Sequence, residues 1–290
     1  MHKVASNARI AFQGEPGAFS QIAARKLLGD AVQTVACPTF ESLFSSIEEG
    51  RADLILAPLE NTLAGPVLRC YDLIYQSSLR MIGEVVLRIG HCVIGCPGSS
   101  IEGLRRIQSH PVALAQCEQF FAAHPAIVKA VAEDTAGSVR EVMERADPAI
   151  AAIASEYAAR EYGAQILASA VEDDPKNFTR FALLQPDSAA LSMDTPAIPA
   201  TDDSDADATT LVLTVANQPG ALFRSLEPFA TNNVDLMSLV SRPLVGAPWH
   251  YRFFLEVAAA STDPRMTKAL AELEPRTVEL RVLGSYHSGK

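Results

Sequence analysis

The sequence predicts an α/β fold with two lobes around a cleft, followed by a smaller βαββαβ domain. At 290 residues the chain is longer than one ordinary core requires, so about two domains are expected. Residues 9–184 alternate short apolar strands with helical stretches, which is typical of an α/β domain with a largely parallel sheet. Residues 185–208 are rich in Pro, Asp, Ala and Ser, which is a linker's composition. The expected boundaries are therefore 8–184, 185–208 and 209–285.

The first lobe is expected to begin with a strand at 9–12, and a glycine turn then leads into a helix that opens near Ser20. Apolar residues at i, i+3, i+4 and i+7 form the face of a second helix, which Gly50 ends. This face consists of Phe40, Leu43, Phe44 and Ile47. Residues 54–57 are expected to form a buried strand, and residues 58–62 follow its C-terminal end. Because open α/β sheets bind ligands at strand ends, this segment is the first site candidate.

The second lobe is expected to follow a strand at 85–94 that is long enough to cross between two lobes. Helices are expected near Gln116, after the capping pair Asp134-Thr135 and before Gly163. The remaining strands are expected at 107–111, 127–131, 150–154, 165–171 and 177–184. Two lobes joined by crossing strands would leave a cleft between them.

The linker carries most of the negative charge. Six Asp and no Lys or Arg occur in residues 185–208, so this segment contributes −6 to the formal net charge of −10. After it, helices are expected behind Pro219-Gly220 and Asp263-Pro264. Strands are expected at 209–216, 236–241, 250–257 and 277–283. The order βαββαβ is that of a ferredoxin-like unit, and such units often pair edge to edge.

Composition and charge exclude several classes of protein. The net charge of −10 argues against a non-specific nucleic-acid binder, since phosphates are neutralised by Lys and Arg. No apolar run reaches the roughly 18–20 residues of a membrane helix. Five cysteines form an odd set without disulfide spacing, and the N-terminus lacks the apolar region of a signal peptide, so a cytoplasmic protein is expected. His91, Cys92 and Cys96 match no common zinc spacing, so no metal site is expected.

No common catalytic motif stands out. Gly14-x-x-Gly17 lacks the Lys of a phosphate-binding loop and the third glycine of a dinucleotide site, so a tight turn is the better interpretation. The remaining candidates are mostly uncharged polar residues near predicted strand ends and helix starts: Glu60, Asn61, Thr62, Ser109, Gln116, Thr135, Asn177 and Thr179. Taken singly, each could simply cap a helix, end a strand or face solvent.

The strand at 177–184 is harder to dismiss. Side chains alternate along a strand, so Asn177, Thr179 and Phe181 project from one face. Arg180 points to the other face. An amide, a hydroxyl and an aromatic ring on one face could surround an aromatic-sized ligand.

Five ordered motifs resemble the prephenate dehydratase family. They are Phe-Gln-Gly-Glu-Pro-Gly-Ala-Phe-Ser at 12–20, Ala-Pro-Leu-Glu-Asn-Thr at 57–62, Ile-Gln-Ser-His-Pro at 107–111 with Gln-Cys at 116–117, Asp-Thr-Ala-Gly at 134–137 and Asn-Phe-Thr-Arg-Phe at 177–181. Residues 219–222 and 241–243 resemble the ACT regulatory domain that follows in that family. The resemblance implies a periplasmic-binding-protein-like catalytic domain and a ferredoxin-like ACT domain.

The resemblance implies a carbon–oxygen lyase of L-phenylalanine biosynthesis, which converts prephenate to phenylpyruvate without a cofactor. The threonine of the Thr-Arg-Phe motif, associated with protonating the leaving hydroxyl, maps to Thr179. A lone hydroxyl is a weak acid, so a relay is expected, and Glu60 is the titratable candidate if burial raises its pKa. The implied substrate-binding residues are Asn61, Thr62, Ser109, Gln116, Thr135, Arg180 and Phe181.

Some of these residues have more specific expected roles. Phe181 would shape the ring pocket, whereas Arg180 would either hold substrate or pin its strand. Helix N-terminal amides near Ser20 and Thr135 could bind the carboxylates of the substrate.

Phenylalanine is expected to inhibit through residues 209–283, at Gly220, Ala221 and Leu222, where glycine and a helix N-terminus suit an amino acid's carboxylate. Ser241 and Arg242 belong to the second regulatory motif. That motif commonly begins with Glu, where this chain has Val240, so weak inhibition is expected. The resemblance also implies a homodimer or homotetramer.

Two alternatives remain open. Arogenate dehydratase is the close one, because arogenate differs from prephenate only by an amino group in place of the side-chain keto oxygen. A non-catalytic binding protein is the alternative from a different class, since two lobes around a cleft also describe solute-binding proteins.

Overall fold

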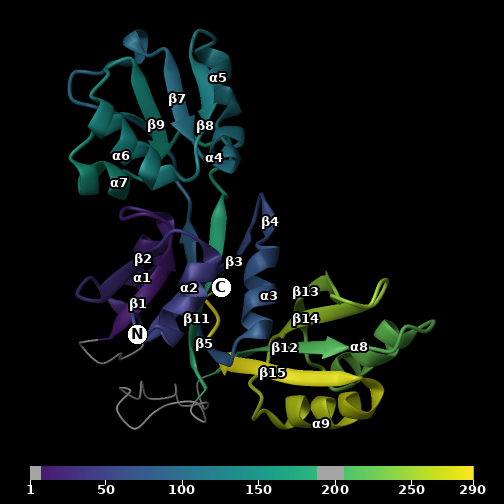
Figure 1. Ribbon diagram of the computed structural model, residues 1–290. Coiled ribbons are helices and arrows are strands. Elements are labelled where there is room, and N and C mark those ends of the chain that lie inside the picture. Colours follow the sequence, from purple (N-terminus) through teal and green to yellow (C-terminus); the bar gives the residue numbers. More distant parts are fainter. Residues whose placement is uncertain (1–7, 188–205, 290) are drawn as a thin grey trace.

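The computed structural model describes residues 8–187 and 206–289, and these form three sheets (Figure 1). Two sheets belong to the two lobes of the first half of the chain, and the third belongs to the C-terminal unit. The expected two-lobed α/β fold is thereby confirmed. Most of the expected linker, residues 188–205, lies outside the described residues.

The first lobe holds a sheet in the order β2-β1-β3-β11-β5, with the short β4 paired to β3. Strands β2, β1 and β3 run parallel, whereas β11 is antiparallel to both of its neighbours. The elements of this lobe are β1 (Arg9–Gln13), α1 (Phe19–Leu28), β2 (Gln33–Cys37), α2 (Phe40–Glu48), β3 (Leu54–Asn61), β4 (Gly65–Pro66), α3 (Leu68–Gln76), β5 (Leu79–Arg88) and β11 (Phe178–Pro186).

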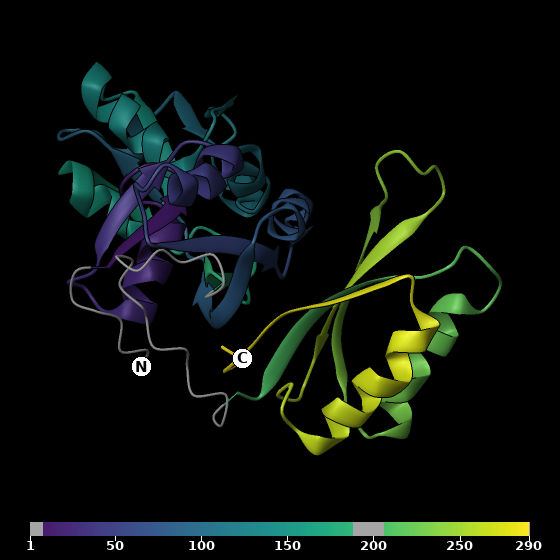
Figure 2. The same cartoon turned by 60° about the horizontal axis from the view of Figure 1, so that its bottom comes forward.

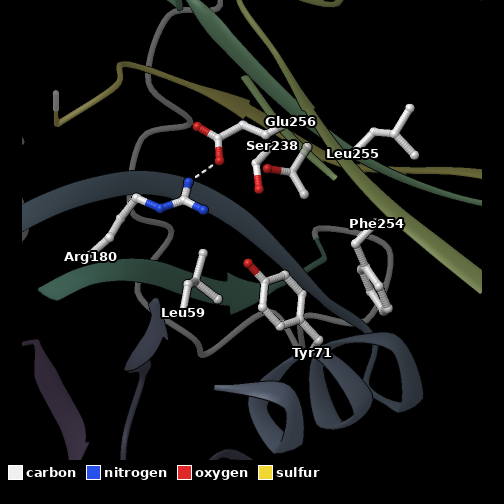
Figure 3. A pocket seen from close by; sticks show the side chains of 8 residues that line it. Leu59, Tyr71, Arg180, Ser238, Phe254, Leu255 and Glu256 are labelled. Atoms are coloured by element: carbon white, nitrogen blue, oxygen red, sulfur yellow. Dashed lines mark hydrogen bonds and ion pairs between the residues drawn. The ribbon is translucent and has the colours of Figure 1, made fainter. Parts of the chain in front are cut away.

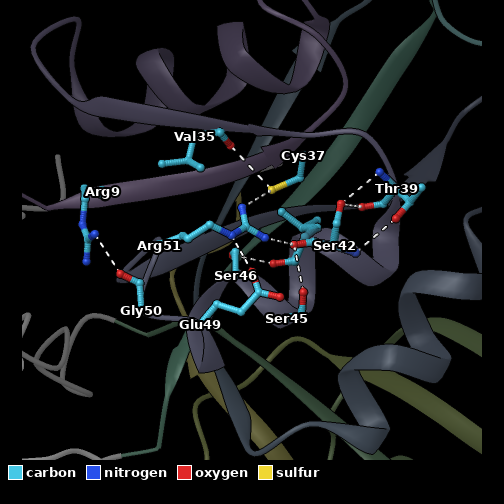
Figure 4. Close-up of polar contacts among 11 residues, drawn as sticks. Arg9, Val35, Cys37, Thr39, Ser42, Ser45, Ser46, Glu49, Gly50 and Arg51 are labelled. Carbon is cyan, nitrogen blue, oxygen red and sulfur yellow. Dashed lines mark hydrogen bonds and ion pairs between the residues drawn. The ribbon is translucent and has the colours of Figure 1, made fainter.

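Polar side chains fix the start of α2 (Figure 4). The Thr39 hydroxyl accepts from the Ser42 amide, and the Ser42 hydroxyl accepts from the Thr39 amide, both at 3.1 Å. This reciprocal capping box satisfies two N–H groups that a helix start leaves unpaired. After the helix, Arg51 donates to the Ser42 carbonyl at 3.0 Å and to the Cys37 thiol at 3.7 Å, which ties the loop back to β2.

The second lobe holds a sheet in the order β10-β6-β9-β7-β8. Strands β9, β7 and β8 run parallel, and β6 and β10 join them antiparallel. The elements of this lobe are β6 (Cys92–Gly95), β7 (Arg106–Ser109), α4 (Pro111–Ala115), α5 (Glu118–Ala123), β8 (Val128–Val131), α6 (Thr135–Arg145), β9 (Ile150–Ala154), α7 (Glu156–Tyr162) and β10 (Gln165–Ser169).

Three expectations about the strands were wrong. Both sheets are mixed rather than largely parallel, because the strands next to each crossing run antiparallel to their neighbours. The expected single strand at 85–94 is broken between β5 and β6, and the Ile89 amide instead donates to the Asn177 carbonyl of the second crossing at 2.8 Å. Residues 58–61 are not a loop beyond a strand, since β3 continues through them.

The C-terminal unit has the expected order βαββαβ. Its antiparallel sheet has the order β13-β14-β12-β15. The elements are β12 (Ala208–Thr214), α8 (Ala221–Thr231), β13 (Leu236–Pro243), β14 (Tyr251–Val257), α9 (Pro264–Leu273) and β15 (Glu279–Tyr286). Both helices lie on one face of this sheet, and the other face is turned to the first lobe (Figure 2). No helix in the described part of the chain has the length and apolar character that a membrane crossing needs.

The first lobe and the C-terminal unit share one hydrophobic core. Tyr71 of α3 packs its ring against Phe254 of β14, with ring centroids 5.1 Å apart, and Tyr286 is fully buried in the same cluster. Around this core, Arg242 of β13 pairs with Asp72 of α3 through two contacts, at 2.8 and 2.5 Å. The C-terminal unit is therefore packed on the first lobe rather than merely tethered to it.

One glycine permits this close packing. Gly284 of β15 has φ of +155°, and a Cβ placed on it would lie 2.0 Å from the carbonyl oxygen of Met81 in β5. We expect Gly284→Ala to lower the free energy of unfolding by more than about 1 kcal/mol, since overpacking forces the backbone apart. Thermal or denaturant unfolding measures this. Gly98→Ala is the control, because Gly98 has φ of +91° but no neighbour within 4 Å of the added Cβ. Equal losses in both variants would contradict the packing argument.

Candidate active site

Four side chains of the candidate site meet where the lobes join. Asn61, at the end of β3, lies directly opposite Thr179 of β11, so both project from the same face of the sheet. The Asn61 amide nitrogen donates to Thr179 Oγ1 at 3.0 Å and to Asn177 Oδ1 at 2.7 Å. Asn177 in turn donates to Gln116 Oε1 of the second lobe at 2.9 Å. Residues from both lobes thus form one continuous chain of hydrogen bonds.

Two backbone amides set the direction of this chain of hydrogen bonds. The Asn61 side-chain oxygen accepts from the amides of Leu63 and Ala64, at 3.0 and 2.9 Å. Because those groups can only donate, the Asn61 nitrogen must face Asn177 and Thr179. Thr179 is therefore an acceptor within the chain, and its own proton remains available to a ligand. Thr179 is only partly buried, so a ligand can reach it.

The chain of hydrogen bonds ends at His91, which from the sequence was a candidate only for binding a metal. His91 Nε2 lies 3.0 Å from Gln116 Oε1, which also accepts from Asn177, so Nε2 carries the proton. Burial lowers the pKa of His91, which is 2% exposed, and this favours the neutral ring. Nδ1 is buried and finds no hydrogen-bond partner among the described residues. His91 thus holds the Gln116 amide in place as a neutral donor.

This burial predicts a pH dependence of stability. Below pH ~6.5 the unfolded chain takes up a proton at His91 that the folded protein binds less readily. The free energy of unfolding is therefore at its full value above that pH and decreases below it. The hydrogen bond to Gln116 and the charge of nearby Glu172 oppose the shift only in part. We expect His91→Gln, which keeps a donor for Gln116, to lose less thermal stability than the wild type between pH 7.5 and 5.5. His110, whose pKa burial also lowers, contributes equally to both proteins. An equal fall of the melting temperature in both proteins between pH 7.5 and 5.5 would contradict this.

Glu60 does not face Thr179, contrary to the relay expected of it. It pairs with Arg180 across the two strands, and its carboxylate lies 3.5 Å from the Arg180 guanidinium. Neighbouring residues of a strand point to opposite faces, so Asn61 shares the face of Thr179 and Glu60 does not. Arg180 is 5% exposed and is held by carboxylates, which corrects the expectation that it binds substrate and agrees with the alternative that it pins the strand.

Three further expected substrate contacts lie elsewhere. Phe181 is 2% exposed and packs in the core beneath α1, so it does not shape a ring pocket. Ser109 is fully buried and donates to the Ile153 carbonyl at 2.6 Å, which joins β7 to β9. Thr62 is exposed but binds the backbone of the second crossing, donating to the Lys176 carbonyl at 2.9 Å and accepting from the Phe178 amide at 3.0 Å.

The two expected helix N-termini differ. Helix α1 begins without a side-chain cap, and although the Gln21 amide donates to the Ala18 carbonyl at 3.0 Å, the amides of Phe19 and Ser20 remain for an anion. Helix α6 begins at Thr135, but the Asp134 carboxylate already accepts from the Gly137 amide at 2.7 Å. A second carboxylate beside Thr135 would be repelled. The α1 terminus is therefore the better anion site of the two.

A pocket of about 250 Å³ lies between the lobes on the side of α1. It is lined by Phe19 of α1, by Leu87 of β5 and by the start of α7. Leu87 is the β5 residue that pairs with Thr179. The Gly14–Gly17 segment is the tight turn expected: the Ser155 hydroxyl of the second lobe donates to the Gly17 carbonyl at 2.8 Å.

The expected regulatory residues divide into two groups. Ala221 and Leu222 line a pocket of about 160 Å³ in the C-terminal unit, together with Trp249 and Tyr251. Gly220, with φ of +76°, directly precedes α8 as its N-cap. By contrast, Arg242 is paired with Asp72 of the first lobe, and neither it nor the adjacent Ser241 lines this pocket.

All five cysteines are buried and free, and no group of three or more His, Cys, Asp or Glu side chains within residues 8–187 and 206–289 could hold a metal ion.

Comparison with known proteins supplies the family. A family model described as prephenate dehydratase matches residues 10–189. The chain belongs to the prephenate dehydratase family. It is 36% identical to arogenate dehydratase/prephenate dehydratase 2 of Arabidopsis thaliana, over 97% of this chain and 73% of that protein. It is 33% identical to the bifunctional chorismate mutase/prephenate dehydratase of Escherichia coli K12, over 97% of this chain and 71% of that protein.

Solved structures of similar proteins cover both halves of the chain. A prephenate dehydratase from Arthrobacter aurescens in complex with L-Phe has a TM-score of 0.84 and 31% identity, over 97% of this chain and 90% of that chain. A structure described as GqqA, a novel type of quorum quenching acylase, has a TM-score of 0.85 and 35% identity, over 97% of this chain and 98% of that chain. The prephenate dehydratase family thus includes relatives with the same arrangement of lobes and C-terminal unit.

Proposed function

We propose that the protein is a carbon–oxygen lyase that converts prephenate to phenylpyruvate, carbon dioxide and water. The single observation that carries this proposal is the hydrogen-bond chain that leaves the proton of Thr179 free at the junction of the lobes. Membership of the prephenate dehydratase family supports the choice of substrate.

The reaction needs little from the protein beyond positioning and one proton. The bond from the ring to its carboxylate breaks, and its electron pair completes the aromatic ring as the C4 hydroxyl leaves. The hydroxyl departs as water if a donor protonates it. Thr179 donates this proton, and the Asn61 amide donates to Thr179 Oγ1 and stabilises the oxygen as its proton moves away. A proton from solvent restores the Thr179 hydroxyl after carbon dioxide and water have left. One such acid contact is worth ~10²–10⁴ in rate.

The substrate carboxylates are expected at two places that the site supplies. The uncapped start of α1 offers backbone N–H groups. Gln116, held by Asn177 and His91, brings a side-chain amide from the second lobe. Because these groups come from different lobes, binding would draw the lobes together and exclude water from the reacting hydroxyl.

Phenylalanine is proposed to bind the pocket beside Leu222 and to inhibit turnover. The Arthrobacter aurescens relative was solved in complex with L-Phe, which supports this ligand. The pocket combines apolar and aromatic side chains with the start of α8, and these suit the ring and the carboxylate of an aromatic amino acid.

Steady-state assays with prephenate and arogenate on one preparation test the function. We expect phenylpyruvate from prephenate, and the same rate after dialysis against a chelator, since no step assigned above uses a metal. Phenylalanine from arogenate at a higher kcat/KM would assign the protein to the arogenate dehydratases, which the names of several relatives favour. Turnover of neither substrate would refute the proposed function.

A further inference from the structure

Arg180 pairs with carboxylates from three strands, and Figure 3 shows its ion pair with Glu256. Its guanidinium pairs with Glu84 of β5 at 2.9 Å, with Glu60 of β3 at 3.5 Å and with Glu256 of β14 in the C-terminal unit. The side chains of Glu84 and Glu256 are 0% and 3% exposed. Glu256 of the C-terminal unit therefore reaches the face of β11 opposite to the one that carries Thr179.

The register places this ion cluster directly behind the catalytic face. Thr179 lies opposite Asn61, and the next pair along the same strands is Arg180 opposite Glu60. Successive Cα atoms are about 3.8 Å apart. The pairing with β3 changes register immediately after Arg180, whereas the pairing with β5 stays regular from Phe178 to Leu183, so a regular ladder holds β11 here on one side only. Whatever fixes the Arg180 side chain thus helps to fix the direction of the Thr179 hydroxyl.

The cluster is confined to one geometry. Two buried carboxylates share one guanidinium, and moving Arg180 away would take the cation from both of them in a medium of low dielectric. Burial raises the pKa of Glu84, Arg180 opposes the shift, and the nearby Glu256 carboxylate adds to it. The adjoining cavity, lined by Leu59, Tyr71 and Arg180, has only about 10 Å³, room for about one water.

The position of Glu256 is fixed by the packing of the C-terminal unit. Phe254, two residues earlier on β14, packs against Tyr71 in the shared core. The same strand begins with Tyr251 and Phe253, which line the pocket of the C-terminal unit. Strand β14 therefore runs from that pocket to the ion cluster behind Thr179.

We propose that Glu256 is a positioning residue for Thr179, supplied to the catalytic strand by the C-terminal unit and acting through Arg180. The proposal rests on the function proposed above, in which Thr179 protonates the leaving hydroxyl. Glu256 touches no substrate, and its contribution is to the geometry of the acid.

Glu256→Gln is the test variant, because it removes the charge at nearly constant volume while Arg180 keeps Glu84 as its partner. We expect kcat for prephenate to fall about tenfold with KM changed less than about twofold, since small misplacements of a catalytic group lower the rate of the chemical step. Asp72→Asn is the matched control: it breaks another ion pair between the units, the partly buried pair of Asp72 with Arg242, and should leave kcat unchanged. Equal kcat values for Glu256→Gln and the wild type would overturn the proposal.

A double variant separates positioning from a general loss of stability. In a Thr179→Val background the acid is absent, so Glu256→Gln should lower kcat no further. The same tenfold fall in both backgrounds would overturn the proposal.

Amide hydrogen exchange gives a readout that does not depend on turnover. Exchange in β11 around Thr179 should accelerate in Glu256→Gln and not in Asp72→Asn. Unchanged exchange would overturn the positioning role, whereas a wild type that turns over neither prephenate nor arogenate would refute the proposed function instead.

Discussion

Replacing Thr179 with Val is expected to lower kcat for prephenate by at least ~10²-fold while the protein stays folded. The change removes the hydroxyl proton at nearly constant volume, and a general-acid contact is worth that much. The fold should survive because the Asn61 amide nitrogen keeps two other acceptors, Asn177 Oδ1 and the Phe178 carbonyl, at 2.7 and 3.1 Å. Steady-state kinetics and a melting curve measure the two parts of this prediction.

Thr179→Ser is the matched variant, since it keeps a hydroxyl for Asn61 and for the substrate. It should retain more activity than Thr179→Val. If the Val variant kept its kcat and only raised KM, Thr179 would contribute uniform binding rather than proton donation.

Phenylalanine should inhibit turnover about fivefold, the low end of the ~5–150-fold range of typical allosteric couplings. The reason is that Val240 stands where the ACT domain that residues 219–222 and 241–243 resemble commonly has Glu. Val240 packs against the core shared by the two units. Trp249 lines the pocket and is the only tryptophan of the chain, so its fluorescence should change saturably as phenylalanine binds. Inhibition and fluorescence should show the same half-saturating concentration.

Two neighbouring residues provide a sharp control for the location of this ligand. Leu222 lines the pocket, and Leu222→Asp would set a negative charge against the ligand's carboxylate. Phe223 is 72% exposed and does not line the pocket, so Phe223→Asp adds the same charge outside it. We expect only Leu222→Asp to abolish the fluorescence change and the inhibition. Persistent inhibition in Leu222→Asp would place phenylalanine elsewhere, for example in the interlobe cleft.

Local sequence signals predicted most of the elements. The apolar run of β9 matches its predicted bounds of 150–154, and α6 starts behind the capping residue Asp134 as expected. Strand β2 and helix α3 were missed. In β2 only Cys37 is fully buried, so this strand shows no alternation of buried and exposed side chains. Helix α3 has neither a side-chain cap nor an acidic residue in its first turn.

The candidate site was predicted in part. Alternation along β11 predicts that Arg180 and Thr179 point to opposite faces of the sheet. The structure confirms this, since Thr179 contacts Asn61 whereas Arg180 pairs with Glu84. The same rule applied to β3 would have separated Glu60 from Asn61. Burial depth was harder to foresee: Phe181 shares the parity of Thr179 but lies beneath α1.

Long-range contacts could not be deduced from one sequence. Gln116 and Asn177 meet only because two crossings bring the lobes together, and His91 joins them where the predicted single strand breaks. The pairing of Arg180 with Glu256 depends on how the C-terminal unit docks on the first lobe, which no local pattern records.

A single-turnover experiment, with protein in excess over prephenate, tests the central claim most directly, because it isolates the chemical step from substrate binding and product release. The wild type, freed of metal, should form one phenylpyruvate per prephenate, and Thr179→Val should do so at least ~10²-fold more slowly. Equal rate constants for the two proteins would contradict the assignment of Thr179 as the proton donor, and no phenylpyruvate from the wild type would contradict the reaction itself.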